Sequence, residues 1–204
     1  MLKKFIKKNV LAFFSLFPLN SKKIMFESNS EIKDNSKELF LKCLDFGLND
    51  KYQLVWAVEN PKEYSEKFKA YDNVVFVEKK KTESRSLSFW YHCCTAKYCF
   101  YTHNLLGQRT RKGQKNIFLT HGTPIKDTRG MFWAPYENTD IISTSEFAAC
   151  LRCKTFGGGD DIVRILGFPR NDSLFKSDKG TDDYFNKIKK NKFIIWLPTF
   201  KRHN

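Results

Sequence analysis

One short run of residues combines a titratable ring, a bare backbone and a positive charge. His121 follows an apolar stretch over 117–119, so it is expected at the end of a strand. Gly122 lets a ligand approach the backbone closely, and Lys126 supplies a fixed charge. Pro124 suits the first turn of a helix, where unpaired N–H groups favour phosphate. These residues are typical of phosphoryl transfer; the alternative is an ordinary strand-to-loop turn with a hydrogen-bonded histidine.

Two further motifs lie downstream, and each carries an arginine. They read Gly167-Phe168-Pro169-Arg170-Asn171-Asp172 and Leu197-Pro198-Thr199-Phe200-Lys201-Arg202. A reacting phosphorus centre needs positive potential around its oxygens, and Arg170, Lys126 and then Arg202 are the candidates. Thr123 adds a hydroxyl or N–H donor. The alternatives are that Arg170 caps the next helix and that Lys126 is merely solvated.

In this order, the runs HGTPIK, GFPRND and LPTFKR resemble those of the CDP-glycerol glycerophosphotransferase family, the teichoic acid primases and polymerases. The runs Phe26-Glu27-Ser28 and Asp34-Asn35-Ser36 also fit, so the resemblance covers essentially the whole chain. One departure is Thr120, because the family usually has Trp before the histidine. This change alters the packing behind the imidazole.

The resemblance implies a GT-B architecture with two Rossmann-like halves, of which this chain holds the acceptor half, the second domain being truncated. We expect a basic amphipathic membrane-interface segment over 1–23 and a Rossmann-like acceptor domain over 24–166. A linker and the first strand of an incomplete nucleotide-binding domain then occupy 167–204. The fold class is therefore α/β, and a complementary downstream half is an expected partner.

The resemblance also implies a reaction. A polyol phosphate passes from CDP-glycerol or CDP-ribitol to a lipid-linked glycerol phosphate acceptor, and CMP is released. His121 is then the general base, and no metal or cofactor is implied. The expected substrate-binding residues are Gly122, Thr123, Lys126, Arg170, Asn171, Asp172 and Arg202. The alternative is an inactive half-transferase that binds membrane or anionic polymer without catalysis.

Size and charge agree with anionic partners. The 204 residues carry 36 Lys and Arg against 22 Asp and Glu, a formal net charge of +14. Such an excess favours phosphate polymers, nucleotides or anionic lipid. The sequence contains no recognisable nucleic-acid-binding motif, so we expect no nucleic-acid partner, although a basic nucleic-acid binder is a third hypothesis.

The first 23 residues contain basic side chains and no acid. Their apolar run over 10–18 is too short to span a bilayer, and the residues after it form a poor cleavage site. A helix lying among anionic headgroups is the favoured interpretation; a signal-like or spanning segment and an ordinary fold element are the alternatives. We therefore expect a peripheral protein on the cytoplasmic face of the cell membrane.

Short apolar runs alternate with helical patterns through the rest of the chain, which indicates a sheet covered by helices on both faces. A capping box, Ser143-x-x-Glu146, predicts a helix through Cys153, and a Gly-rich loop over 157–159 is interpreted as a connector. Ligands should then bind at the carboxyl ends of the strands. The predicted strands span 24–26, 54–58, 74–77, 98–101, 117–119, 141–142, 162–166 and 193–197.

Other polar residues have weaker signals. Arg111 and its basic neighbours, in the loop over 108–115, either grip an acceptor phosphate chain or form a solvated face. Asp34 and Asn35 follow the first strand and could touch acceptor hydroxyls. His92 is interpreted as structural, whereas His103 could line the cleft. The six cysteines include Cys150-x-x-Cys153, for which free thiols are favoured over a metal site in a reducing compartment.

Overall fold

The computed structural model describes residues 9–28, 31–79, 86–102, 110–122, 138–156 and 160–175, without the side chains of 152–156 and Asp160. The chain divides into two compact units, Met1–Asn171 and Asp172–Asn204. The first unit holds the sheet and the motif around His121. Of the second unit, the structure describes residues 172–175.

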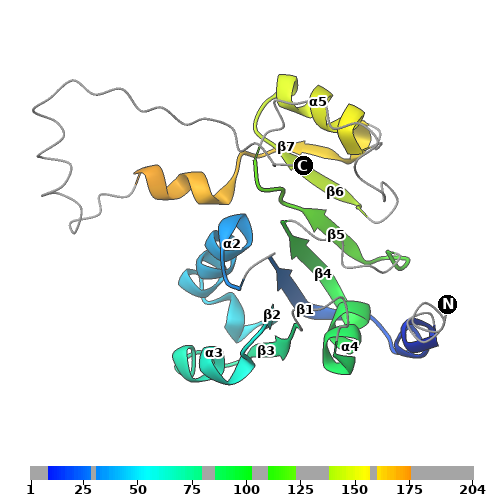
Figure 1. Cartoon of the computed structure of the whole chain (residues 1–204), viewed down its shortest axis with the longest axis vertical. Helices are drawn as coiled ribbons and strands as arrows, with labels where there is room; N and C mark the ends of the chain where they lie inside the picture. Colours follow the sequence, from blue (N-terminus) through cyan, green and yellow to red (C-terminus); the bar gives the residue numbers. More distant parts are fainter. Residues whose placement is uncertain are drawn as a thin grey trace, which may run out of the picture. The chain divides into compact units, whose positions relative to one another are not determined.

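Seven parallel strands form one sheet in the order β3-β2-β1-β4-β5-β6-β7 (Figure 1). Each predicted strand within the described residues is present, which confirms the α/β prediction. The eighth predicted strand, 193–197, lies outside the described residues. The strands are β1 (Asn20–Glu27), β2 (Gln53–Val58), β3 (Val74–Glu78), β4 (Ala96–Tyr101), β5 (Lys115–Phe118), β6 (Asp140–Ser143) and β7 (Val163–Ile165).

Helices alternate with strands along much of the chain, as in other doubly wound folds. Residues 9–14 form a helix before β1. The α-helices after it are α2 (Asp34–Asp45), α3 (Pro61–Lys67), α4 (Leu87–Thr95) and α5 (Glu146–Phe156). The short 3₁₀ helices are η1 (Leu48–Asp50), η3 (Asp160–Ile162) and η4 (Pro169–Phe175).

Alternating side chains of the central strands fill two separate cores. Met25 of β1 belongs to the core beside α4, whereas Ile24 and Phe26 belong to the core beside α2. In β2, Val55 and Trp56 divide between the same two cores. Because strand side chains alternate between faces, strands buried on both faces appear in the sequence as continuous apolar runs.

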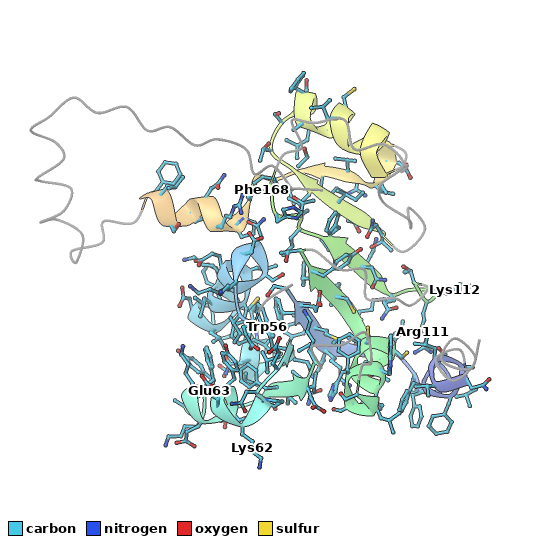
Figure 2. All side chains as sticks on the ribbon, viewed as in Figure 1. Trp56, Lys62, Glu63, Arg111, Lys112 and Phe168 are labelled. Atoms are coloured by element: carbon cyan, nitrogen blue, oxygen red, sulfur yellow. The ribbon has the colours of Figure 1, made fainter. Side chains whose placement is uncertain are left out.

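Three aromatic rings form the centre of the core beside α2 (Figure 2 labels Trp56). Phe26 stacks on Trp56 with ring centroids 5.4 Å apart, and Phe40 meets the Trp56 ring edge-on at 5.1 Å. All three side chains are fully buried. This packing fixes α2 against β1, and so fixes the residues that connect the two elements.

A buried ion pair lies where β1 and β3 end. Lys79 Nζ lies 2.6 Å from Glu27 Oε1, and the same ammonium donates to the Ser28 carbonyl. Glu27 is fully buried, and the Lys79 side chain is 9% exposed. Ser36 Oγ donates to Glu27 O at 2.9 Å, so the first turn of α2 is attached to the same point.

The predicted boundary at residue 23 falls inside a strand, because β1 begins at Asn20. Lys23 is 3% exposed, and its ammonium donates to Thr95 Oγ1 at 2.8 Å and lies 4.6 Å from the centre of the Tyr91 ring. Burial lowers the pKa of Lys23. Its charge therefore belongs to the fold and is not available to a membrane surface.

His92 of α4 belongs to the fold as well. Burial, and then the Lys23 charge, lower the pKa of His92 from 6.5 to about 4. Between these values the unfolded chain binds a proton that the folded chain does not. The free energy of unfolding should therefore fall as pH drops from about 6.5 toward about 4. Urea denaturation at several pH values measures this, and His92→Gln should flatten the dependence; an equal slope in both proteins would contradict it.

The start of α5 differs from the prediction. Ser145 Oγ, and not the Ser143 hydroxyl, accepts from the Ala148 N–H at 3.2 Å. Ser143 is still part of β6, so the helix begins at Glu146 and runs to Phe156. The S-x-x-E pattern located the helix but not the capping residue.

The cysteines with described side chains are free thiols. Cys93, Cys94 and Cys99 are buried, and Cys150 is exposed. Burial raises the pKa of Cys43 to about 11, so this thiol is protonated at neutral pH. Cys153, and with it the predicted Cys-x-x-Cys pair, has no described side chain, and the glycines over 157–159 also lie outside the described residues. No metal-binding group of His, Cys, Asp or Glu occurs among the residues that the structure describes.

Candidate active site

The strand order reverses between β1 and β4, which creates a topological switch point. Strands β2 and β3 lie on one side of β1, and strands β4 to β7 lie on the other. In open parallel sheets, ligands bind outside the carboxyl ends of the strands at such a point. The segments that leave β1, β4 and β5 here carry Asp34, Asn35, Thr102 and His121.

His121 lies three residues beyond the last residue of β5, and its side chain is exposed. Its Nδ1 lies 3.4 Å from the carbonyl oxygen of Thr102, the residue after β4. A carbonyl only accepts, so this long hydrogen bond favours the tautomer with the proton on Nδ1. Nε2 then carries the lone pair, which is the arrangement that a general base needs.

The backbone around His121 is unusual. Thr120 is 1% exposed and has a φ of 57°, a left-handed conformation that β-branched residues rarely adopt. Gly122 has a φ of 159°, and a Cβ there would lie 3.6 Å from Arg170 Nη2. The Arg170 guanidinium therefore lies beside the loop that carries His121.

Arg170 is held by the first residue of α2. Its Nη1 lies 3.0 Å from Asp34 Oδ1, and the two side chains are 42% and 14% exposed. The guanidinium is thus oriented by a carboxylate and remains accessible to an anion from solvent. A site role for Arg170 stays a prediction.

The residues before Arg170 show why the motif Gly167-Phe168-Pro169-Arg170 contains a glycine and an aromatic residue. Gly167 has a φ of 80°, which glycine adopts without strain. Phe168 is 7% exposed and packs with Leu119 and Ile142 at the ends of β5 and β6. The Arg170 guanidinium lies 5.8 Å from the centre of the Phe168 ring. Phe168 therefore anchors the motif, and Arg170 follows at the sheet edge.

The other predicted site residues are not all placed at this edge. Asn171 is exposed, and its N–H donates to the Phe168 carbonyl at 2.9 Å. Asp172 is also exposed and is the first residue of the second unit. Thr123, Lys126, Arg202 and His103 lie outside the described residues. The structure therefore brings together His121, Gly122 and Arg170.

Asn35 has a different role from the predicted contact with acceptor hydroxyls. It is fully buried, and its amide bonds to the carbonyls of Leu119 and Thr120 and to the Arg170 N–H. A side chain in this position cannot reach an acceptor. The sequence alone could not reveal this role, because every partner lies 84 or more residues away.

Arg111 was expected either to grip an acceptor phosphate chain or to form a solvated face, and in the structure its guanidinium binds backbone carbonyls. It precedes β5, at the opposite end of the strand from His121, and Figure 2 shows Arg111 well apart from Phe168. Its guanidinium donates to the carbonyls of Ser15 and Phe17 at 2.8 and 2.9 Å. Arg111 thus ties the N-terminal segment to the loop before β5.

The family model described as CDP-Glycerol:Poly(glycerophosphate) glycerophosphotransferase matches residues 10–204. This chain belongs to that glycerophosphotransferase family. The match includes all three motifs, and so confirms the resemblance on which the site prediction depended. The sequence has no match among curated proteins.

This glycerophosphotransferase-family chain is similar to solved structures of the wall teichoic acid polymerase TagF. One is 17% identical with a TM-score of 0.64, over 93% of this chain and 50% of that chain. A TagF variant soaked with CDPG is 16% identical with a TM-score of 0.65, over 93% and 52%. The likeness confirms the predicted α/β fold of GT-B type, and the chain spans about half the length of these polymerases.

Proposed function

We propose that this chain is the acceptor-binding half of a CDP-polyol phosphotransferase of teichoic acid or capsule polymer synthesis. CDP-glycerol is the favoured donor, because the family description names it and a similar polymerase was soaked with CDPG. The observation that carries the proposal is an exposed histidine beside a carboxylate-held arginine at the switch point. CDP-ribitol is the other donor that the sequence permits.

The proposed reaction needs a base. The acceptor hydroxyl oxygen bonds to the phosphorus that carries the polyol, and His121 Nε2 takes the hydroxyl proton. The bond from that phosphorus to the pyrophosphate bridging oxygen breaks, and CMP leaves. General base catalysis of this kind contributes typically 10²–10⁴-fold. The Nδ1 contact with the Thr102 carbonyl supports this assignment, because it leaves the lone pair on Nε2.

The reaction also needs positive charge. Arg170 lies close to the histidine loop, because its Nη2 would be 3.6 Å from a Cβ at position 122. Its planar donors suit the oxygens of a phosphate. Asp34 neutralises part of this charge, so we assign Arg170 to orienting a phosphate that is already bound.

The direct test is CMP release from CDP-glycerol with a glycerol phosphate acceptor. It is run with the chain alone and with a nucleotide-binding half added. Release that depends on the acceptor supports the transferase. The competing hypothesis, an inactive half-transferase, predicts binding of anionic polymer without CMP release under either condition. CDP-ribitol in parallel reactions identifies the donor.

We also propose that the N-terminal segment lies on an anionic membrane surface. Its inner residues Val10, Leu11 and Phe14 pack against the core, whereas Phe13 and Leu16 are 57% and 80% exposed. Two exposed apolar side chains on a docked segment suit a headgroup layer. No helix among the described residues is long and apolar enough to cross a membrane.

Replacing Phe13 and Leu16 together with Ser should weaken binding to anionic vesicles at least about tenfold, because each buried side chain contributes about 1.5–3 kcal/mol. Vesicle flotation measures the bound fraction. Phe147→Ser is the matched control, because Phe147 is 77% exposed but lies on α5. Equal binding by the double variant and the wild type would contradict the membrane proposal. Deleting residues 1–23 is unsuitable, because β1 begins at Asn20.

A further inference from the structure

The side-chain amide of Asn35, at the start of α2, bonds to both the histidine loop and the arginine motif of the candidate site. Its Nδ2 donates to the carbonyls of Leu119 at 3.3 Å and Thr120 at 2.8 Å. Its Oδ1 accepts from the backbone N–H of Arg170 at 3.2 Å. The side chain is fully buried. One residue at the start of α2 thus fixes both the loop that carries His121 and the arginine motif.

The bond to Thr120 is made where the backbone is strained. Thr120 has a φ of 57°, a left-handed conformation that is strained in a β-branched residue. Strain of this kind persists only where surrounding contacts hold it. The Thr120 carbonyl belongs to the peptide bond that leads into His121, so holding it sets the direction in which the imidazole leaves the sheet.

The neighbouring residue holds the other end of the arginine. Asp34 Oδ1 lies 3.0 Å from Arg170 Nη1 and also accepts from the Asn35 N–H at 2.9 Å. Asn35 therefore fixes the Arg170 backbone while Asp34 fixes its side chain. The start of α2 therefore holds both Arg170 and the loop that carries His121.

We propose that Asn35 is a positioning residue that orients His121 and Arg170 toward each other and touches no substrate. Its effect on turnover rests on the proposed function of His121. Its effect on the ring does not, because ring orientation is measurable without any reaction. Misplacing a catalytic group by about 1 Å costs on the order of 10²-fold in rate, so Asn35→Ala should lower kcat by about that factor.

The experiment is an NMR titration of the ¹⁵N-labelled chain that follows the His121 ring nitrogens, assigned with His121→Gln. In the wild type the tautomer with the proton on Nδ1 should dominate. In Asn35→Ala and Asn35→Asp, the ring should show the tautomer mixture of a free histidine. Asn116→Ala is the matched control, because Asn116 is 1% exposed and its amide donates to Thr110 Oγ1 at the other end of β5. This control should keep the wild-type ring signals.

An unchanged His121 tautomer in a folded Asn35 variant would overturn the proposal. If neither Asn35 variant folds, the proposal is tested on the wild-type protein through the NMR signals of the Asn35 side-chain amide. The Asn35 side-chain amide protons should then exchange slowly with solvent and shift at the His121 titration midpoint. Amide signals that ignore this midpoint would also overturn it. If the ring responds as expected but His121→Ala keeps full activity, the proposed function fails while the positioning role of Asn35 stands.

Discussion

Replacing His121 with Ala should lower transferase turnover by at least about 10²-fold, because the acceptor hydroxyl then loses the group that takes its proton. The fold should remain, since the His121 side chain is exposed and lies outside the two cores that flank the central strands. The measurement is the rate of CMP release from CDP-glycerol under the conditions in which the wild type is active. Vesicle binding should be unchanged, because the N-terminal segment lies at the other end of the strands.

Two additions make this test specific to proton transfer. Imidazole in the buffer should restore part of the rate to His121→Ala, because a free base can occupy the vacated position. His92→Gln, which alters a histidine of α4 outside the site, should keep the wild-type rate. A His121→Ala protein that turns over at the wild-type rate would remove this residue from the base role.

Replacing Lys79 with Met should lower the free energy of unfolding by about 3–5 kcal/mol, because it removes the Lys79 cation from the fully buried Glu27 carboxylate. Urea denaturation at pH 7 measures the change. The effect should be among the largest for a single polar residue, since Lys79 also donates to the Ser28 carbonyl.

The matched control for this variant is Lys69→Met. Lys69 forms an ion pair with Glu66 in which both side chains are 71% exposed, and exposed pairs contribute about 0–1 kcal/mol. Removing both buried charges, in Lys79→Met with Glu27→Leu, should recover much of the lost stability. Equal effects of Lys79→Met and Lys69→Met would show that burial of the Glu27–Lys79 pair contributes nothing.

Strand positions were predictable because burial on both faces leaves a plain signal. The apolar runs over 54–58 and 74–77 match β2 and β3 to within one residue at each end. The beginning of β1 was missed, because Asn20 to Lys23 is polar and resembles a leader. Its buried lysine contacts Tyr91 and Thr95 of α4, about 70 residues away, and no local pattern encodes these contacts.

The placement of the candidate site residues was predictable in part. His121, Gly122 and Arg170 lie in short motifs whose composition is itself unusual, so they could be selected from the sequence. The role of Asn35 was missed, because a lone Asn after a strand resembles a ligand contact. Its actual partners, including the Arg170 N–H 135 residues away, become apparent only once the strands are ordered. The Arg111 contacts with Ser15 and Phe17 were missed for the same reason.

Because Arg111 anchors residues 15 and 17, the N-terminal segment is held at the end of the sheet opposite to His121. The eight residues of β1 extend from this end of the sheet to the opposite one, about 25 Å at about 3.3 Å per residue. With β1 taken upright on the proposed membrane surface, the imidazole would stand off from the bilayer by roughly that length. We propose that an extended, lipid-linked acceptor spans this length and places its growing tip at the reaction centre.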